Sequence, residues 1–181
     1  MRTDNIVISL INTEKYQEVL KTVPHKNVLD LSMVYRCITE MPEGGICSII
    51  VNYRMLEKLN MTEDELHQLA LENTHAMLPL KMEAIEHHFY VLSNEKRVFG
   101  AVGMFITDEI RQLAEFYESN LFIMPSSVHE VFVMPDFGQE KEYIKSVIED
   151  ANETVVREKD ILSDSLYYYD YEEKELRLEL K

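Results

Sequence analysis

The sequence predicts an α+β fold, in which antiparallel sheet is built from repeated β-hairpin–helix units and the helices pack on one face. The first observation is a repeat: the apolar runs Gly45–Asn52 and Gly100–Thr107 both end at a polar residue that suits a helix N-cap. The second observation is that apolar residues recur at helical spacing after each run. These residues are Met55, Leu56 and Leu59 in one case, and Ile110, Leu113 and Ala114 in the other.

Length and composition predict a single α+β domain over residues 1–181. The chain is long enough to bury a core, and its 46% of apolar residues is ordinary for a globular protein. We expect two similar hairpin–helix units at about 28–78 and 88–118, followed by a hairpin–helix–hairpin at 121–180. No low-complexity linker separates these segments.

Three strands and one helix are predicted before residue 52. Thr13–Thr22 has helical spacing, and Pro24 stops that helix. Met41–Gly45 contains proline and two glycines, and this turn signal joins the last two strands into a hairpin. The strands are Ile6–Asn12, Val28–Ile38 and Ile46–Val51.

Two helices are predicted next. Asn52 caps the first, which covers about Tyr53–Leu59. Thr62–Glu65 contains a capping box for the second, with acidic residues in the first turn where the helix dipole favours them. Pro79 ends the helical region, and Leu80–His87 fits a loop or a short helix.

The second half of the chain is predicted to repeat the hairpin and the helix. A turn at Ser93–Arg97 joins the strands His88–Leu92 and Val98–Ile106. Gly100 and Gly103 in the latter indicate a bulge or a close backbone approach. The remaining elements are helices at Asp108–Glu118 and Gln139–Ala151, and strands at Leu121–Met124, Val128–Met134, Leu166–Tyr169 and Leu176–Leu180. In the last helix, the residues expected to face the core are Tyr143, Ile144, Val147 and Ile148.

The charge disfavours several classes of partner. The chain has 33 Asp and Glu residues against 18 Lys and Arg, a formal net charge of −15. Nucleic acids and anionic membranes are bound by basic stripes, and here only Lys96 and Arg97 stand side by side. We therefore expect no nucleic-acid partner and no membrane partner. The acidity and the lack of a recognisable signal peptide predict a cytoplasmic protein.

No metal and no cofactor are predicted. Cys37 and Cys47 lie on partner strands of one predicted hairpin, and we expect reduced, buried thiols. Glu72 and His75 share a helix face, but a di-iron site needs a second such pair and further carboxylates. The sequence has no phosphate-binding glycine loop, no Cys-x-x-Cys and no His-Glu-x-x-His.

A polar cluster between two predicted strands raises a hydrolase hypothesis. Ser126, Ser127, His129 and Glu130 are the candidates, with Asp164 brought in by folding. On a strand, Ser127 and His129 would face the same side with Cβ atoms roughly 6–7 Å apart, too far for easy contact. In the alternative interpretation the serines cap a turn, and His129 and Glu130 pair with nearby backbone or with each other.

Tyrosines near the C-terminus raise a binding hypothesis. Alternation places Tyr167 and Tyr169 on one face of a strand, with Tyr171 following, and such rings can bind peptides or bases. Alternatively, the rings cover the edge of the sheet. The acidic flanks favour this alternative, because stacking platforms for nucleic acid come with basic residues.

Four parts of the chain carry a family resemblance: Leu10–Asn12 with Val23–His25 and Asp30–Leu31, Ala70–Thr74, Phe122–Val131, and Ile161–Asp164 with Tyr167–Tyr169. In this order they resemble the uncharacterised bacterial family named domain of unknown function 5688, over its C-terminal two-thirds. Because members of that family extend further at the N-terminus, we expect a short member or a trimmed form. The resemblance implies a related fold and brings no activity, cofactor or catalytic residue with it.

We expect a non-enzymatic protein- or peptide-interaction module, because the fold signals are clear and no chemistry is assembled. The alternative is a hydrolase that uses Ser127, His129 and Glu130. A weaker alternative is an acidic mimic of nucleic acid that binds a basic protein, and this requires one continuous acidic face.

Overall fold

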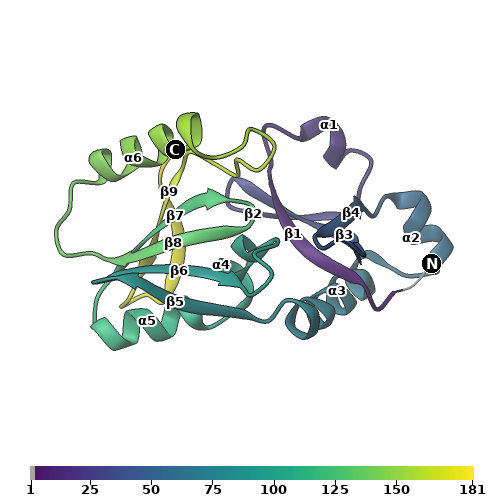
Figure 1. The fold of residues 1–181 in the computed structure, drawn as a ribbon, viewed down its shortest axis with the longest axis horizontal. Coiled ribbons are helices and arrows are strands. Elements are labelled where there is room, and N and C mark those ends of the chain that lie inside the picture. Colours follow the sequence, from purple (N-terminus) through teal and green to yellow (C-terminus); the bar gives the residue numbers. More distant parts are fainter. Residues whose placement is uncertain (1–2) are drawn as a thin grey trace. The chain divides into compact units, whose positions relative to one another are not determined.

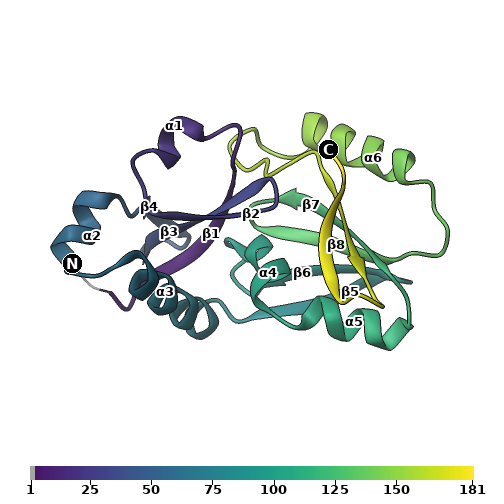
Figure 2. The same ribbon diagram turned by 180° about the vertical axis from the view of Figure 1, so that it is seen from behind.

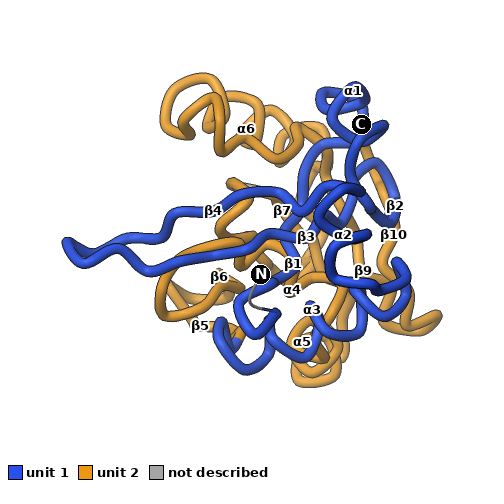
Figure 3. Tube along the Cα trace, turned by 90° about the vertical axis from the view of Figure 1, so that its right-hand side faces the viewer, with its two compact units in different colours: residues 1–79 blue, residues 80–181 orange. Residues whose placement is uncertain are grey.

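The structure, a computed structural model, describes residues 3–181, apart from the side chain of Ser126. The chain forms two compact units, Met1–Pro79 (unit 1) and Leu80–Lys181 (unit 2), which Figure 3 distinguishes by colour. Each unit has its own antiparallel sheet, and this confirms the predicted α+β class with antiparallel sheets. The expectation of a single domain over the whole chain stays a prediction.

Unit 1 is built on a four-stranded sheet whose central strand is β3 (Leu31–Glu40). One edge of β3 pairs with β1 (Ile6–Asn12), and the other pairs with β2 (His25–Val28) and then with β4 (Ile46–Ile50), as Figure 1 shows. All residues of β1 are buried except the last, as its mostly apolar sequence predicts.

The helices of unit 1 begin at local sequence signals. α1 (Gln17–Leu20) is one turn, shorter than predicted. α2 (Tyr53–Leu59) starts at Asn52, whose side chain accepts a hydrogen bond from the backbone N–H of Met55 at 3.0 Å. α3 (Glu63–Met77) starts with the predicted capping box, in which both reciprocal hydrogen bonds are present. These two predictions are confirmed.

α3 lies against the free edge of β1 and takes the place of a neighbouring strand. The Asn73 amide donates hydrogen bonds to the carbonyls of Thr3 and Ile6 at 2.7 and 2.9 Å. The buried Thr74 hydroxyl accepts from the backbone N–H of Ile8 at 2.9 Å. Because an open strand edge can pair with another chain, these side chains protect β1 from such pairing.

Unit 2 contains a six-stranded antiparallel sheet in the order β10-β9-β7-β8-β6-β5. Three hairpins supply it, and the C-terminal one is yellow in Figure 2. The sequence of Leu80–His87 fits a loop or a short helix. In the structure this segment forms β5, because it pairs with β6. The strands are β5 (Leu80–Glu86), β6 (Phe89–Asn94), β7 (Leu121–Ser127), β8 (Glu130–Pro135), β9 (Leu166–Asp170) and β10 (Glu175–Leu180).

Helices cover both faces of this sheet, whereas the sequence predicts helices on one face. α6 (Lys141–Thr154) packs over Phe122, and α5 (Glu109–Tyr117) lies along the opposite face (Figure 1). The difference follows from the strands, which are apolar on both sides. Ile123 and Tyr167, which point away from α6, are 0% exposed, as is Phe122. A sheet with two apolar faces needs cover on both.

The prediction that Val98–Ile106 forms a strand is wrong. Its residues form a 3-10 turn, η1 (Gly100–Val102), followed by α4 (Gly103–Ile106). Because β6 pairs instead with β5 and β8, the second predicted hairpin does not form at 88–106. A short apolar run suits a buried helix as well as a buried strand, and Phe99, with a φ of 55°, turns the chain out of the strand direction.

Two expectations about side chains are also wrong. On α6, Ile144 and Ile148 face the core as predicted, but Tyr143 and Val147 are 67% and 47% exposed. Residues one position apart on a helix are rotated by about 100°, so the buried stripe of α6 excludes these two. Cys47 is a free and exposed thiol rather than a buried one, because β4 presents it on the outer side of the sheet.

Candidate functional site

The predicted hydrolase cluster lies at the hairpin turn between β7 and β8. Ser127 pairs with Glu130, so Val128 and His129 form a two-residue turn. The interpretation that His129 lies on the same strand as Ser127 is therefore wrong, because the turn redirects the chain between them. The side chain of Ser126 lies outside the described part of the structure.

Contacts occupy both ring nitrogens of His129. Nδ1 accepts a hydrogen bond from the backbone N–H of Phe99 at 3.3 Å, and Nε2 lies 3.4 Å from Oδ1 of Asp160. Because Nδ1 is the acceptor, the neutral ring carries its proton on Nε2, facing Asp160. The Phe99 ring also packs near the imidazole, with ring centroids 5.9 Å apart. Among the described side chains, neither nitrogen is directed at a nucleophile.

Ser127 reaches the backbone of His129 and not its ring. The Ser127 hydroxyl accepts from the backbone N–H of His129 at 3.0 Å, and the serine is 8% exposed. A serine nucleophile needs its hydroxyl hydrogen-bonded to the nitrogen of the base. The observed contact is instead the side chain-to-backbone type that the alternative interpretation of these residues expects.

The turn docks onto the start of η1. The His129 carbonyl accepts from the Gly100 N–H at 2.9 Å and from the Ser93 hydroxyl at 2.8 Å, and the Val128 carbonyl accepts from the Ala101 N–H at 3.4 Å. The first N–H groups of a helix have no partner within it, so the turn supplies acceptors. A Cβ at Gly100 would lie 2.4 Å from the His129 carbonyl oxygen, and only glycine fits without a shift.

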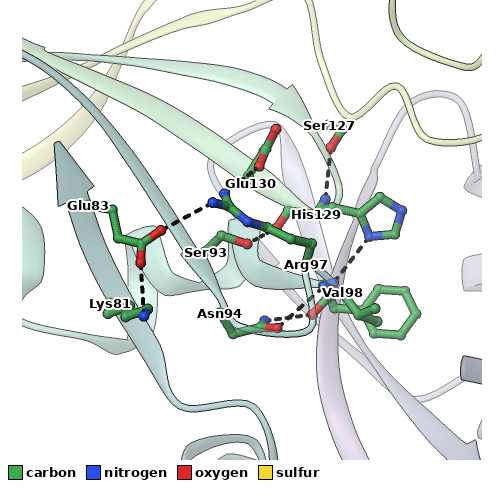
Figure 4. Close-up of polar contacts among 10 residues, drawn as sticks. Lys81, Glu83, Ser93, Asn94, Arg97, Val98, Ser127, His129 and Glu130 are labelled. Carbon is green, nitrogen blue, oxygen red and sulfur yellow. Dashed lines mark hydrogen bonds and ion pairs between the residues drawn. The ribbon is translucent and has the colours of Figure 1, made fainter. Parts of the chain in front are cut away.

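Arg97 connects β5 with β8 beside this turn (Figure 4). Its guanidinium lies between two carboxylates, with Nη2 3.1 Å from Glu83 and Nη1 3.0 Å from Glu130. Lys81 contacts the other oxygen of Glu83 at 2.8 Å, and this hydrogen bond lowers the pKa of Glu83. These side chains are 27–49% exposed, so solvent weakens the attraction in each pair. The network joins the loop that precedes Phe99 to β5 and β8.

Among the described residues, Asp164 makes no contact with His129. It is exposed, and its carboxylate accepts from the Asn152 side chain of α6 at 2.7 Å. The carboxylate beside the imidazole is that of Asp160 instead. Sequence reasoning missed Asp160 and Arg97 because both lie in loops that match no motif. The adjacent basic residues Lys96 and Arg97 were the only local signal.

Two of the three tyrosines proposed as a binding surface are core residues. Tyr167 and Tyr169 are 0% and 7% exposed, so a surface role for these two rings is wrong. Helix α5 covers the face of β9 on which they lie, and the rings fill the space beneath it. Tyr171 is half-buried, and its backbone N–H donates to the Asn120 side chain at 2.8 Å.

An exposed set of aromatic residues, here called the aromatic cluster, lies at the opposite end of the unit 2 sheet from the β7–β8 turn. It comes from the β5–β6 turn and the start of β6, the C-terminal end of α5 and the loop after β8, which meet at one end of the unit in Figure 1. Two of its rings, Phe116 and Phe137, are 75% and 58% exposed. Its members are His88, Tyr90, Phe116, Tyr117 and Phe137.

Tyr117 holds the aromatic cluster together. Its ring centroid lies 5.0–6.1 Å from those of the other four members, in edge-to-face arrangements. Its hydroxyl bonds to the Tyr90 hydroxyl at 2.6 Å and to Nδ1 of His88 at 3.0 Å. The hydrogen bond to Tyr90, followed by burial, raises the pKa of Tyr117 to about 12. The hydroxyl is therefore neutral at physiological pH. Sequence reasoning missed this cluster because its members are distant along the chain.

Acidic residues surround the aromatic cluster. The segments 84–90, 112–120 and 134–140 contain five Asp and Glu residues and no Lys or Arg. Unit 2 as a whole has 22 Asp and Glu residues against 11 Lys and Arg. A hollow of about 560 Å³ adjoins the cluster at the β5–β6 turn, and its lining is Ala84, Ile85, Glu86 and His87.

Two negative findings apply to the described residues. No three of their His, Cys, Asp and Glu side chains are grouped so that they could hold a metal ion. None of the helices formed by residues 3–181 combines the length and the apolar character needed to cross a membrane.

The fold is that of an α+β protein with two units, and each unit is built on an antiparallel sheet. The model of a family of unknown function, DUF5688, matches residues 2–89 and 82–171. These matches cover nearly the whole chain, so the chain belongs to this family, as the sequence resemblance implied. No curated protein and no solved structure matches the chain.

Proposed function

We propose that this protein is a non-enzymatic protein-interaction module and that the aromatic cluster is its binding surface. The observation that supports this proposal is the exposure of Phe116 and Phe137 beside Tyr117. Aromatic residues are enriched at the centres of protein interfaces, and grouped exposed apolar side chains mark such surfaces.

The internal contacts of the aromatic cluster favour binding. The ring of Tyr117 is fixed by hydrogen bonds to Tyr90 and His88 and by edge-to-face packing with its neighbours. A surface that is already ordered loses less conformational entropy when a partner binds. Tyr and His also offer hydrogen-bonding groups, so the surface can fix the orientation of a partner as well as cover it.

The two alternative functions have less support. A hydrolase would use the imidazole of His129 as a base, but contacts with Phe99 and Asp160 engage both nitrogens. An acidic mimic of nucleic acid needs an unbroken acidic face, whereas Lys81 and Arg97 alternate with carboxylates on the β5–β8 surface.

Site-specific photocrosslinking tests the proposal. A photoreactive phenylalanine analogue is placed at position 116 of the full chain, and in a control at Val155, which is 80% exposed. In cells that naturally contain the protein, we expect position 116 to give a protein adduct of defined mass that position 155 does not. Phe137→Ala should abolish the adduct. Identical adducts at both positions, or an adduct at 116 that is indifferent to Phe137→Ala, would contradict the proposal.

A further inference from the structure

Two carboxylates lie beside the aromatic cluster, and the cations Lys141 and Arg177, which lie over the Tyr168 ring, are paired with Glu179. Glu86 lines the adjoining hollow, and Glu118 follows Tyr117 directly with a φ of 47°. Neither forms an ion pair with any residue in the described range 3–181. Arg111, the nearest basic residue along α5, is already paired with Asp108 and Glu115 at 3.2 and 2.8 Å. The surface therefore has unneutralised negative charge beside exposed rings.

Three features of this surface favour the binding of a positively charged group. The faces of the Phe116 and Phe137 rings carry negative electrostatic potential and attract ammonium and guanidinium groups. The carboxylates of Glu86 and Glu118 can pair with the same groups. The C-terminus of α5 directs the negative end of the helix dipole toward this surface, because α5 ends at Tyr117.

We infer that the aromatic cluster binds a segment of a protein partner in which Lys or Arg alternates with apolar residues. The inference rests on the proposed function and adds the chemistry of the partner. The cationic groups lie on the rings and reach the carboxylates, and the apolar residues contact the exposed edges of Phe116 and Phe137.

Charge complementarity also argues against other occupants. A second copy of the chain would bring two clusters with acidic surroundings against each other, and like charges across an interface are unfavourable. A nucleic acid would be repelled by the same carboxylates.

A peptide-binding experiment with charge-matched controls tests the inference. The probe is a short fluorescein-labelled peptide of alternating Arg and Leu, and its control replaces each Arg by citrulline, which has similar shape and no charge. Fluorescence anisotropy is measured with the full chain at physiological ionic strength, where long-range attraction is screened. We expect the citrulline peptide to bind at least about tenfold more weakly.

Protein variants locate the binding site. The double variant Phe116→Leu with Phe137→Leu keeps the apolar character and the net charge but removes the ring faces. We expect it to bind the Arg peptide about tenfold more weakly. Tyr143→Leu is the matched control, because Tyr143 is 67% exposed on α6, outside the cluster. We expect this control to bind as the unchanged protein does.

The outcomes separate the inference from the proposed function. Equal binding of the Arg and citrulline peptides, or equal loss in the double variant and in Tyr143→Leu, would overturn the inference. If the crosslink at position 116 still depends on Phe137, the proposed function survives that result. Conversely, cluster-dependent binding of the Arg peptide without any crosslinked protein would support the chemistry and contradict the protein-interaction function.

Discussion

Replacing Gly100 by Ala tests how the β7–β8 turn packs on η1. The Gly100 N–H donates to the His129 carbonyl at 2.9 Å, and an added Cβ would lie 2.4 Å from that same oxygen. It would also lie 2.5 Å from the Ser93 hydroxyl oxygen and 2.7 Å from the Ser93 Cα. Because these neighbours include backbone atoms of both His129 and Ser93, the backbone has to move, and the turn separates from η1.

The size of the effect follows from two contributions. Overpacking of a tight site costs about 1–3 kcal/mol. The hydrogen bond between Gly100 and His129 adds about 1 kcal/mol when it is lost. We therefore expect the free energy of unfolding to fall by about 2–4 kcal/mol. For a chain of 150–250 residues this corresponds to a decrease in Tm of roughly 4–16 °C.

Urea denaturation measures this change. The chain has 10 Tyr and 0 Trp, so unfolding is followed by tyrosine fluorescence and far-UV circular dichroism. Gly103→Ala is the control, because the nearest neighbours of a Cβ there are side-chain atoms, at 3.1 Å from Leu92, and no backbone atom has to move. Alanine also favours a helix over glycine by about 1 kcal/mol, so the control should stay close to the unchanged protein. Equal stability of the two variants would refute the close approach at Gly100.

Two further predictions concern unit 1. Thr74→Val should lower the free energy of unfolding by about 1–3 kcal/mol, because the Ile8 N–H loses its buried acceptor, whereas Thr74→Ser should keep most of the stability in the same urea assay. A valine variant as stable as the serine variant would disprove this role of the hydroxyl. Burial raises the pKa of Tyr35 from 10.0 to about 12, so above pH 10 the unfolded chain releases a proton that the folded chain retains. The contribution of Tyr35 to stability is therefore complete below pH 10 and is lost as the pH rises toward 12. Tyr35→Phe should flatten the fall in unfolding free energy between pH 10 and 12, and an unchanged slope would show that Tyr35 is not its source.

Elements with a local cause could be predicted from the sequence. Asn52 and Thr62 act within one helical turn, so the starts of α2 and α3 follow from a few residues. The apolar run of β1 is short, and a strand is the element that it suits. The run 98–106 is different, because its pattern suits a helix or a strand, and contacts with the distant β7–β8 turn select the helix.

The candidate site depends on long-range packing, and the sequence could indicate little of it. Ser127 and His129 are close in sequence, which suggests chemistry. The turn between β7 and β8 instead directs the Ser127 hydroxyl to the His129 backbone and the imidazole to the Phe99 N–H and the Asp160 carboxylate. The aromatic cluster shows the opposite case. Phe116 and Phe137 come from segments separated by two strands, and each alone is an unremarkable exposed ring. Only the pairing of the sheet brings them together.

The closure of the β1 edge by Asn73 and Thr74 has a consequence for misassembly. Helix α3 can detach without breaking any strand pair, because it touches the sheet through side chains rather than through a ladder of backbone bonds. Such detachment would uncover a mostly apolar strand with free N–H and C=O groups along one edge. Partial unfolding at this helix is therefore the step that would convert the protein into a self-associating species. The concentration of this partially unfolded species in mild denaturant should determine when aggregation begins.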